Sequence, residues 1–194
     1  MTEPVLPIEE ALRAVGDILR ASGERVSIVV VGGATMNLLG IVRRSTRDID
    51  VIARAWRDAQ GDLHLTHAEP FPESLRRAIR TVARDLGLPE NWMNAEVGSQ
   101  WVHGLPPWIL DEITWRAYAS LDVGLVGRRT LIALKLFASV DSGPGSVHVQ
   151  DLLALAPTDA ELEESASWVS TQDAYDGFSS MISQVAEHVR RNRP

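Results

Sequence analysis

The 194-residue chain contains no cysteine. Disulfide bonds, zinc–thiolate sites and thiol nucleophiles are therefore excluded. Lysine is almost as scarce, because Lys135 is the only lysine beside eighteen arginines. The Gly-rich loop of a P-loop NTPase must end in Gly-Lys, whereas Leu134 precedes Lys135, so that class of nucleotide hydrolase is excluded as well.

Long apolar runs are also missing. No run approaches the roughly 20 residues that span a bilayer, so we expect no membrane partner and a cytoplasmic location. Acidic residues outnumber basic ones by 26 to 19, and the formal net charge is −7. A protein that coats duplex DNA or other nucleic acid non-specifically is usually basic overall. The sequence disfavours that function and leaves a small, local nucleic-acid contact open.

Hydrophobic patterning divides the chain into two regions. In the first, β-branched runs at 26–31 and 48–53 predict buried strands, and apolar stripes at 7–22 and 73–86 predict helices. The segment from 56 to 69 reads as irregular. A later strand is expected within 108–126. The remaining pattern is helical, at 129–140, 147–155, 158–168 and 174–190.

This pattern predicts an α/β core followed by a small helical bundle. We expect the core to occupy residues 1–127. A small C-terminal helical bundle over residues 128–194 is expected to pack on that core.

The stretch from Val31 to Val51 carries the pattern with the clearest chemistry. Gly32 and Gly33 follow a buried strand, where the lack of side chains lets backbone N–H groups approach a phosphate. Alternation in the next strand places Asp48 and Asp50 on one face. Two carboxylates this close repel each other unless a cation lies between them. Mg²⁺ prefers such oxygen ligands together with substrate phosphates.

Thr46 and Arg47 stand directly before these carboxylates and add a hydroxyl and a positive charge. Each part of the pattern has a commoner reading when it stands alone. A Gly-Gly pair after a strand is often only a turn, and an Asp-x-Asp at a strand start is often only solvated. The combination in this order predicts a site for Mg²⁺ and a nucleoside triphosphate.

Lys135 lies inside an almost wholly apolar predicted helix, and two interpretations remain open on the residues alone. In the first interpretation, the stem of the Lys135 side chain covers the core and its ammonium group reaches water. In the second, the ammonium group is directed at a phosphate or at Asp151.

The sequence resembles the nucleotidyltransferase fold in Gly32-Gly33-Ala34 followed by Arg44-Ser45-Thr46-Arg47-Asp48-Ile49-Asp50-Val51. It is most similar to the branch related to the AbiEii toxins of bacterial toxin–antitoxin and abortive-infection systems. Three later segments resemble further elements of that branch in the same order, and the resemblance spans about residues 26–170. These segments are Leu88–Asn94, Leu131–Ala138 and Gln150–Leu155.

The resemblance implies an α/β fold of the α+β kind, with a mixed sheet core and helices around it. It also implies transfer of a nucleoside monophosphate from an NTP to an acceptor, with release of pyrophosphate. Asp48 and Asp50 would hold Mg²⁺, and Lys135 and Asp151 would belong to the active site. The residues expected to bind the nucleotide are Gly32, Gly33, Thr46 and Arg47. In toxin relatives the acceptor is often a tRNA end, and in neighbouring branches it is a protein side chain or a small molecule. A toxin-like member would have a cognate antitoxin.

Polymerase-like members of this fold carry a third carboxylate on a later central strand, and the sequence has no unambiguous match for it. Asp122 is the first candidate for this third metal ligand, and Glu96 is the second. Because Leu121 and Val123 would face the core, Asp122 would lie on the opposite face, where it could equally be an exposed strand residue. A second function therefore stays open: a catalytically silent relative that binds a nucleotide or a partner protein as a regulator.

Overall fold

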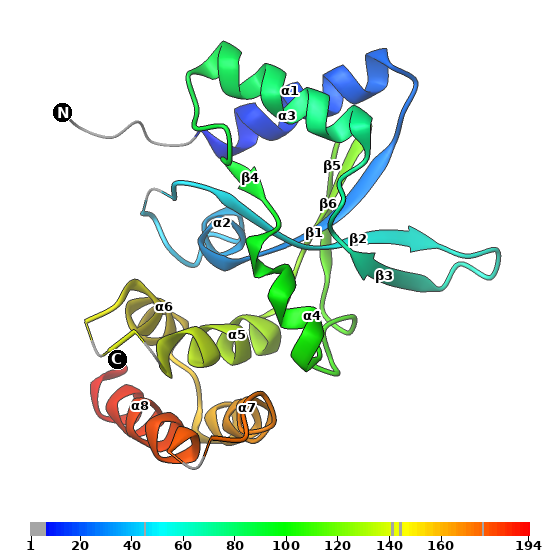
Figure 1. Cartoon of the computed structure of the whole chain (residues 1–194). Coiled ribbons are helices and arrows are strands. Elements are labelled where there is room, and N and C mark those ends of the chain that lie inside the picture. The colour runs from blue at the N-terminus through cyan, green and yellow to red at the C-terminus, as the bar shows by residue number, and fades with distance from the viewer. Residues whose placement is uncertain (1–6, 45, 141, 144, 176) are drawn as a thin grey trace. The chain divides into compact units, whose positions relative to one another are not determined.

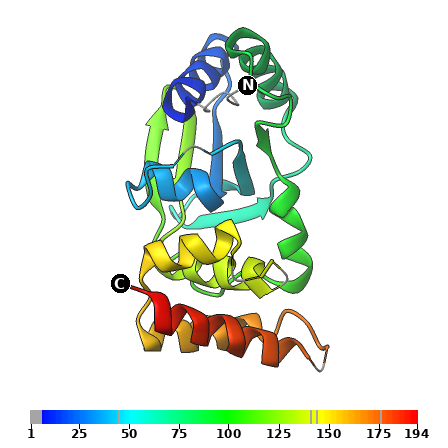
Figure 2. The same cartoon turned by 90° about the vertical axis from the view of Figure 1, so that its left-hand side faces the viewer.

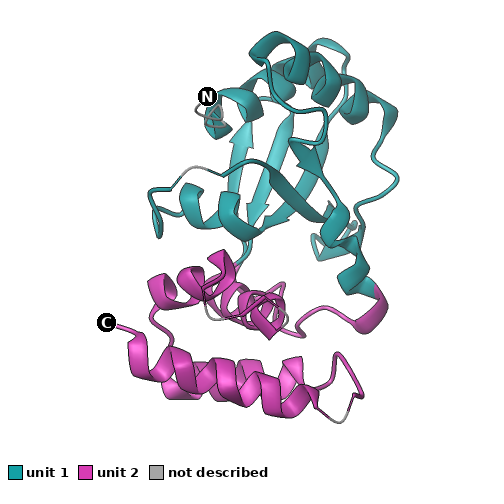
Figure 3. Cartoon of the chain, turned by 60° about the vertical axis from the view of Figure 1, so that its left-hand side comes forward, with its two compact units in different colours: residues 1–101, 113–126 teal, residues 102–112, 127–194 magenta. Residues whose placement is uncertain are grey.

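The computed structural model describes residues 7–44, 46–140, 142–143, 145–175 and 177–194. Ser45 of the motif therefore lies outside the described residues. The chain forms two compact units (Figure 3). The first unit contains residues 1–101 and 113–126, and the second contains 102–112 and 127–194. No helix in the described ranges is long and apolar enough to cross a membrane.

The first unit is built on a six-stranded sheet in the order β3-β2-β1-β6-β5, with β4 paired to β2 beside this path. The central strand β1 runs antiparallel to β2 and parallel to β6, so the sheet is mixed. The strands are β1 (Val26–Val31), β2 (Ile49–Arg57), β3 (Leu63–His67), β4 (Met93–Asn94), β5 (Thr114–Tyr118) and β6 (Leu121–Leu125).

Two helices, α1 (Ile8–Ala21) and α3 (Glu73–Leu86), lie side by side and bury their apolar stripes against this sheet (Figures 1 and 2). The helix α2 (Gly32–Leu38) follows β1 without a connecting loop. Short helical turns, η1 (Glu96–Ser99) and α4 (Gln100–His103), follow β4. The resulting core contains side chains from both long helices and from alternate positions of the central strands.

The segment from 56 to 69 differs from the sequence-based expectation of an irregular connection. β2 continues to Arg57 and pairs with β3, with Trp56 opposite His64. Asp58 closes the turn, because one carboxylate oxygen accepts hydrogen bonds from the backbone N–H groups of Gln60 and Asp62 at 3.0 and 2.9 Å. The overlooked signal is the alternation of leucine with polar residues from 63 to 66, which is typical of a half-buried strand.

The second unit is helical. Phe137 packs edge-on against Trp168 and Phe178, which joins three helices through aromatic contacts. The helices are α5 (Arg128–Val140), α6 (Val147–Leu155), α7 (Asp159–Val169) and α8 (Phe178–Asn192). The predicted α+β fold class, with a mixed sheet and helices, is confirmed.

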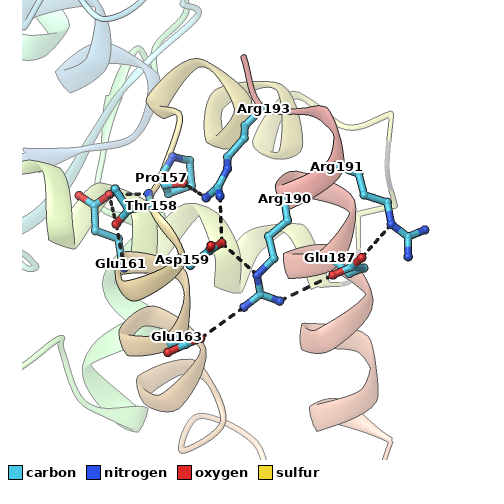
Figure 4. A network of polar contacts seen from close by, with 9 residues as sticks. All are labelled: Pro157, Thr158, Asp159, Glu161, Glu163, Glu187, Arg190, Arg191 and Arg193. Carbon is cyan, nitrogen blue, oxygen red and sulfur yellow. Dashed lines mark hydrogen bonds and ion pairs between the residues drawn. The ribbon is translucent and has the colours of Figure 1, made fainter.

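Polar contacts stabilise the start of α7 and tie it to α8 (Figure 4). Thr158 and Glu161 form a capping box: the Thr158 hydroxyl accepts from the Glu161 N–H at 3.2 Å, and the Glu161 carboxylate accepts from the Thr158 N–H at 2.8 Å. Asp159 in turn lies 3.3 Å from the Arg190 guanidinium of α8. Glu161 also has a charged partner, because Arg128 of α5 donates to its carboxylate at 2.6 Å.

This last contact makes the second unit sensitive to acid. The hydrogen bond from Arg128 lowers the pKa of Glu161 from 4.5 to about 2. A carboxyl group whose pKa falls on folding stabilises the folded state above its unfolded pKa, and this stabilisation is lost as the pH drops from about 4.5 towards 2. Glu161→Gln should lower the free energy of unfolding at neutral pH by about 1–2 kcal/mol, after allowance for screening at the half-exposed Arg128.

Denaturant titrations at several pH values measure this effect. Glutamine can still accept from the Thr158 N–H, so the substitution removes the charge and keeps the capping box. Glu163→Gln is the control, because Glu163 is 74% exposed and lies 4.0 Å from Arg190. Equal pH dependence in the two variants would contradict the assignment to Glu161.

Candidate active site at the end of β1

The centre of the site is the approach of Asp50 to the backbone of Gly32. Val31, the last residue of β1, pairs with Asp50 in β2. Gly32 follows with a φ of +71°, a conformation that L side chains rarely adopt. A Cβ at this position would lie only 2.5 Å from Oδ2 of Asp50. Glycine is therefore required here both by the backbone conformation and by the carboxylate against it.

Asp48 lies on the same side of the chain as Asp50. Ile49 between them is fully buried, whereas both aspartates are partly exposed, as alternation along an extended segment requires. The buried Thr46 donates a hydrogen bond to the Asp48 carbonyl at 3.2 Å and holds this part of the chain in place. The burial pattern thus places Asp48 and Asp50 on the side of the chain opposite Ile49, while their role as metal ligands stays a prediction.

Gly33 faces a hydroxyl and a guanidinium. A Cβ at this position would lie 3.2 Å from both Oγ1 of Thr46 and Nη2 of Arg44. The Asn37 amide donates to the Arg44 carbonyl at 2.8 Å, which positions this arginine. Sequence reasoning assigned the positive charge to Arg47, which is exposed in the same connection, and missed Arg44. Spacing could not distinguish the two, because both precede Asp48 within one irregular stretch.

An open groove adjoins this corner. It has a volume of about 780 Å³ and lies between the start of α1, the end of α2 and the connection 42–46. Arg44 and Thr46 are part of its wall. Its size is that of a small-molecule site, and it shares Arg44 and Thr46 with the surroundings of Gly33.

The structure does not bring Asp122 to the two aspartates. Asp122 pairs with Ser27 near the start of β1, whereas Asp50 pairs with Val31 at its end. At about 3.3 Å per residue, the two pairing positions are about 13 Å apart along β1. Asp122 instead accepts hydrogen bonds from Arg25 at 2.8 and 3.0 Å.

Glu96, the second candidate, is exposed in η1. Its backbone N–H donates to Oδ1 of Asn94 at 2.9 Å. Asn94 itself pairs with Asp50 across β4 and β2, and sequence reasoning did not single it out. Its signal was its place in the Trp-Met-Asn motif, but only the strand pairing shows that this motif borders Asp50.

Lys135 and Asp151 form an ion pair within the second unit. Nζ of Lys135 lies 2.7 Å from Oδ2 of Asp151, and their side chains are 8% and 1% exposed. Of the two interpretations open at the sequence level, the contact with Asp151 is the one observed. A lysine ammonium that merely reached water would be exposed, and this one is not.

The oxygen ligands in the first unit suit a hard divalent cation. Two partly exposed carboxylates lie on one face, and the carboxylate of Asp50 lies against Gly32 at the start of α2. Carboxylate oxygens are ligands that Mg²⁺ prefers. Among the described residues, no group of three His, Cys, Asp or Glu side chains is placed to hold a metal ion. The protein would thus supply two carboxylates, with the remaining ligands coming from neutral groups and the substrate.

A segment of the first unit is similar to a known protein family. Residues 10–86 match the model of a family described as a nucleotidyltransferase of unknown function (DUF6036). The match supports the nucleotidyltransferase family. It runs from α1 to the end of α3 and contains Gly32, Gly33, Asp48 and Asp50. It does not support the AbiEii branch specifically. No curated protein and no solved structure matched the chain.

The ion pair of Lys135 and Asp151 leads to a prediction about stability. Removing one charge of a buried pair leaves the other without compensation, which costs about 3–5 kcal/mol. Asp151→Asn should therefore destabilise the second unit by that amount, as measured by denaturant unfolding. Arg191→Gln is the control in the same unit, because the Arg191–Glu187 pair is largely exposed and its loss should cost less than about 1 kcal/mol. Similar losses in both variants would contradict this account.

Proposed function

We propose that this protein is a Mg²⁺-dependent nucleotidyltransferase that transfers a nucleoside monophosphate from an NTP to an acceptor. The observation that carries the proposal is the carboxylate of Asp50 against Gly32, inside the segment that matches the nucleotidyltransferase family model. Asp48 lies on the same face, and Arg44 and Thr46 converge on Gly33. Two carboxylates, two glycines at the start of a helix and a guanidinium in one segment favour binding of a metal ion together with a triphosphate.

In the reaction, an oxygen of the acceptor attacks the α-phosphorus of the NTP. A bond forms between that oxygen and phosphorus, the bond from the α-phosphorus to the bridging oxygen breaks, and pyrophosphate leaves. The proton of the acceptor hydroxyl passes to solvent. When bound, Mg²⁺ would offset phosphate charge and help to align the attacking and leaving oxygens.

Each predicted site residue has a proposed role in this reaction. Asp48 and Asp50 would hold the ion. Gly32 and Gly33 would keep the phosphate space clear of side chains. The triphosphate would be contacted by Arg44, Thr46 and Arg47. Of these, Arg44 and Thr46 lie against Gly33. Lys135 and Asp151, which the family resemblance places in the active site, are proposed as catalytic residues on the same ground.

For the acceptor we propose an RNA end, such as that of a tRNA, and for the biological role a toxin with a cognate antitoxin in the cytoplasm. The ordered resemblance of four motifs to the AbiEii-related branch supports this. The charge distribution is compatible with it, because residues 151–194 contain 3 basic and 8 acidic residues and thus most of the net charge of −7. The rest of the chain is close to neutral and can meet an RNA end through a local site.

The test is a labelling assay. The full chain is incubated with Mg²⁺, each α-labelled NTP in turn, and total tRNA or cell extract. We expect the wild type to label an acceptor with at least one NTP. Asp50→Asn should reduce the rate on the order of 100-fold or more, because it removes a negatively charged ligand of the proposed Mg²⁺ site.

A pair of glycine substitutions makes the test sharper. Gly32→Ala and Gly87→Ala introduce a side chain at similar φ values, +71° and +64°. Only the first would press a methyl group against Asp50, because nothing lies within 4 Å of a Cβ at Gly87 after α3. We expect Gly32→Ala to lose labelling and Gly87→Ala to retain it. Equal activity of the two variants, or no labelling by the wild type with any NTP, would overturn the proposal.

A second candidate is a catalytically silent regulator that binds a nucleotide or a protein partner. The position of Asp122 favours it, since that carboxylate is engaged with Arg25 and is distant from Asp50 along β1. In this case NTP with Mg²⁺ should raise the melting temperature without any turnover. A labelled acceptor would exclude this candidate.

A further inference from the structure

Asn94 occupies a position next to Asp50 that a metal ligand would require. In the sheet, Asp50 has Val31 of β1 on one side and Asn94 of β4 on the other. Residues paired across adjacent strands project from the same face, about 5 Å apart. Val31 is apolar, so the strand neighbour that presents a polar side chain on the face of Asp50 is Asn94.

A buried tryptophan fixes β4 in this place. Trp92 has no exposed surface, and its indole N–H donates to the carbonyl of Ile79 in α3 at 3.1 Å. The Trp92 carbonyl accepts from the backbone N–H of Ile49, the residue before Asp50, at 2.7 Å. The position of Asn94 is therefore held by the helix layer and by β2 together.

The amide of Asn94 is also oriented. Its Oδ1 accepts from the Glu96 N–H at 2.9 Å, and its Nδ2 donates to the Asn91 carbonyl at 3.3 Å. An amide oxygen has two lone pairs, so one remains for a cation after the bond to Glu96. Unlike a carboxylate, this oxygen adds no net charge and takes up no proton.

We propose that Asn94 is a neutral third ligand beside Asp48 and Asp50, and that the site consequently holds one divalent ion, the one that arrives with the nucleotide. The inference rests on the proposed function. The two carboxylates of the chain balance the charge of one such ion. A second ion, about 3.5–4 Å from the first as in two-metal sites, would find no further carboxylate of the chain and would depend on the charge of the triphosphate alone.

Binding of Mn²⁺, followed by electron paramagnetic resonance in the presence of a non-hydrolysable NTP analogue, tests this on the full chain. We expect one ion per wild-type chain. Asn94→Asp supplies the missing charge and should either add a second ion or tighten binding about 10-fold. Asn94→Ala should weaken binding about 10-fold, the loss typical of a displaced ligand-shell group.

Asn91→Asp is the matched control. It places the same new charge three residues earlier, at an exposed position outside β4, and should leave the stoichiometry and affinity close to those of the wild type. Circular dichroism checks that each variant is folded. If Asn94→Asp does not fold, the ion affinity of Asn94→Ala tests the role of Asn94.

The outcomes separate the two proposals. One ion in the wild type, with Asn94→Asp no different from Asn91→Asp and Asn94→Ala unchanged, overturns the role of Asn94 and leaves the proposed function intact. Two ions in the wild type overturn the single-ion site. A wild type that binds no ion with any nucleotide analogue overturns the proposed function and this inference with it.

Discussion

The approach of a carboxylate to bare backbone at Gly32 is the constraint on which the rest of the first unit depends. Asp50 reaches that position because β1 and β2 pair antiparallel with Val31 opposite Asp50. A shift of one residue in this register would turn Asp50 into the core and Ile49 out of it. The burial of alternate residues along β2 against α1 and α3 is therefore also what keeps the acidic side chains outside the core.

Much of this arrangement could be predicted from the sequence because its causes are local. The β-branched run predicts β1, the Gly-Gly pair predicts the start of a helix directly after it, and the alternation around Ile49 predicts an extended segment with two carboxylates on one face. The same holds for the capping box that begins α7. Local signals failed for β3, where short alternation was outweighed by the polar turn before it.

The remaining features depend on pairing between distant residues, which the sequence pattern does not contain. Alternation correctly left Asp122 outside the core, yet it could not tell which end of β1 that residue would adjoin. Asn94 borders Asp50 only through the two-residue pairing of β4 with β2. Likewise, the apolar helix around Lys135 was visible, but its ion pair joins α5 and α6 and needed the structure.

The path of the chain between the two units has a consequence for synthesis. Residues 102–112 belong to the second unit, although β5 and β6 of the first unit come after them. Within this segment, Trp108 lies under the guanidinium of Arg129 at 4.8 Å. On the ribosome, this segment emerges before the helices it packs with, so it must wait while the sheet of the first unit is completed. The first part of the second unit is thus synthesised before the first unit is complete. Dividing the chain at a single position would not separate the two units.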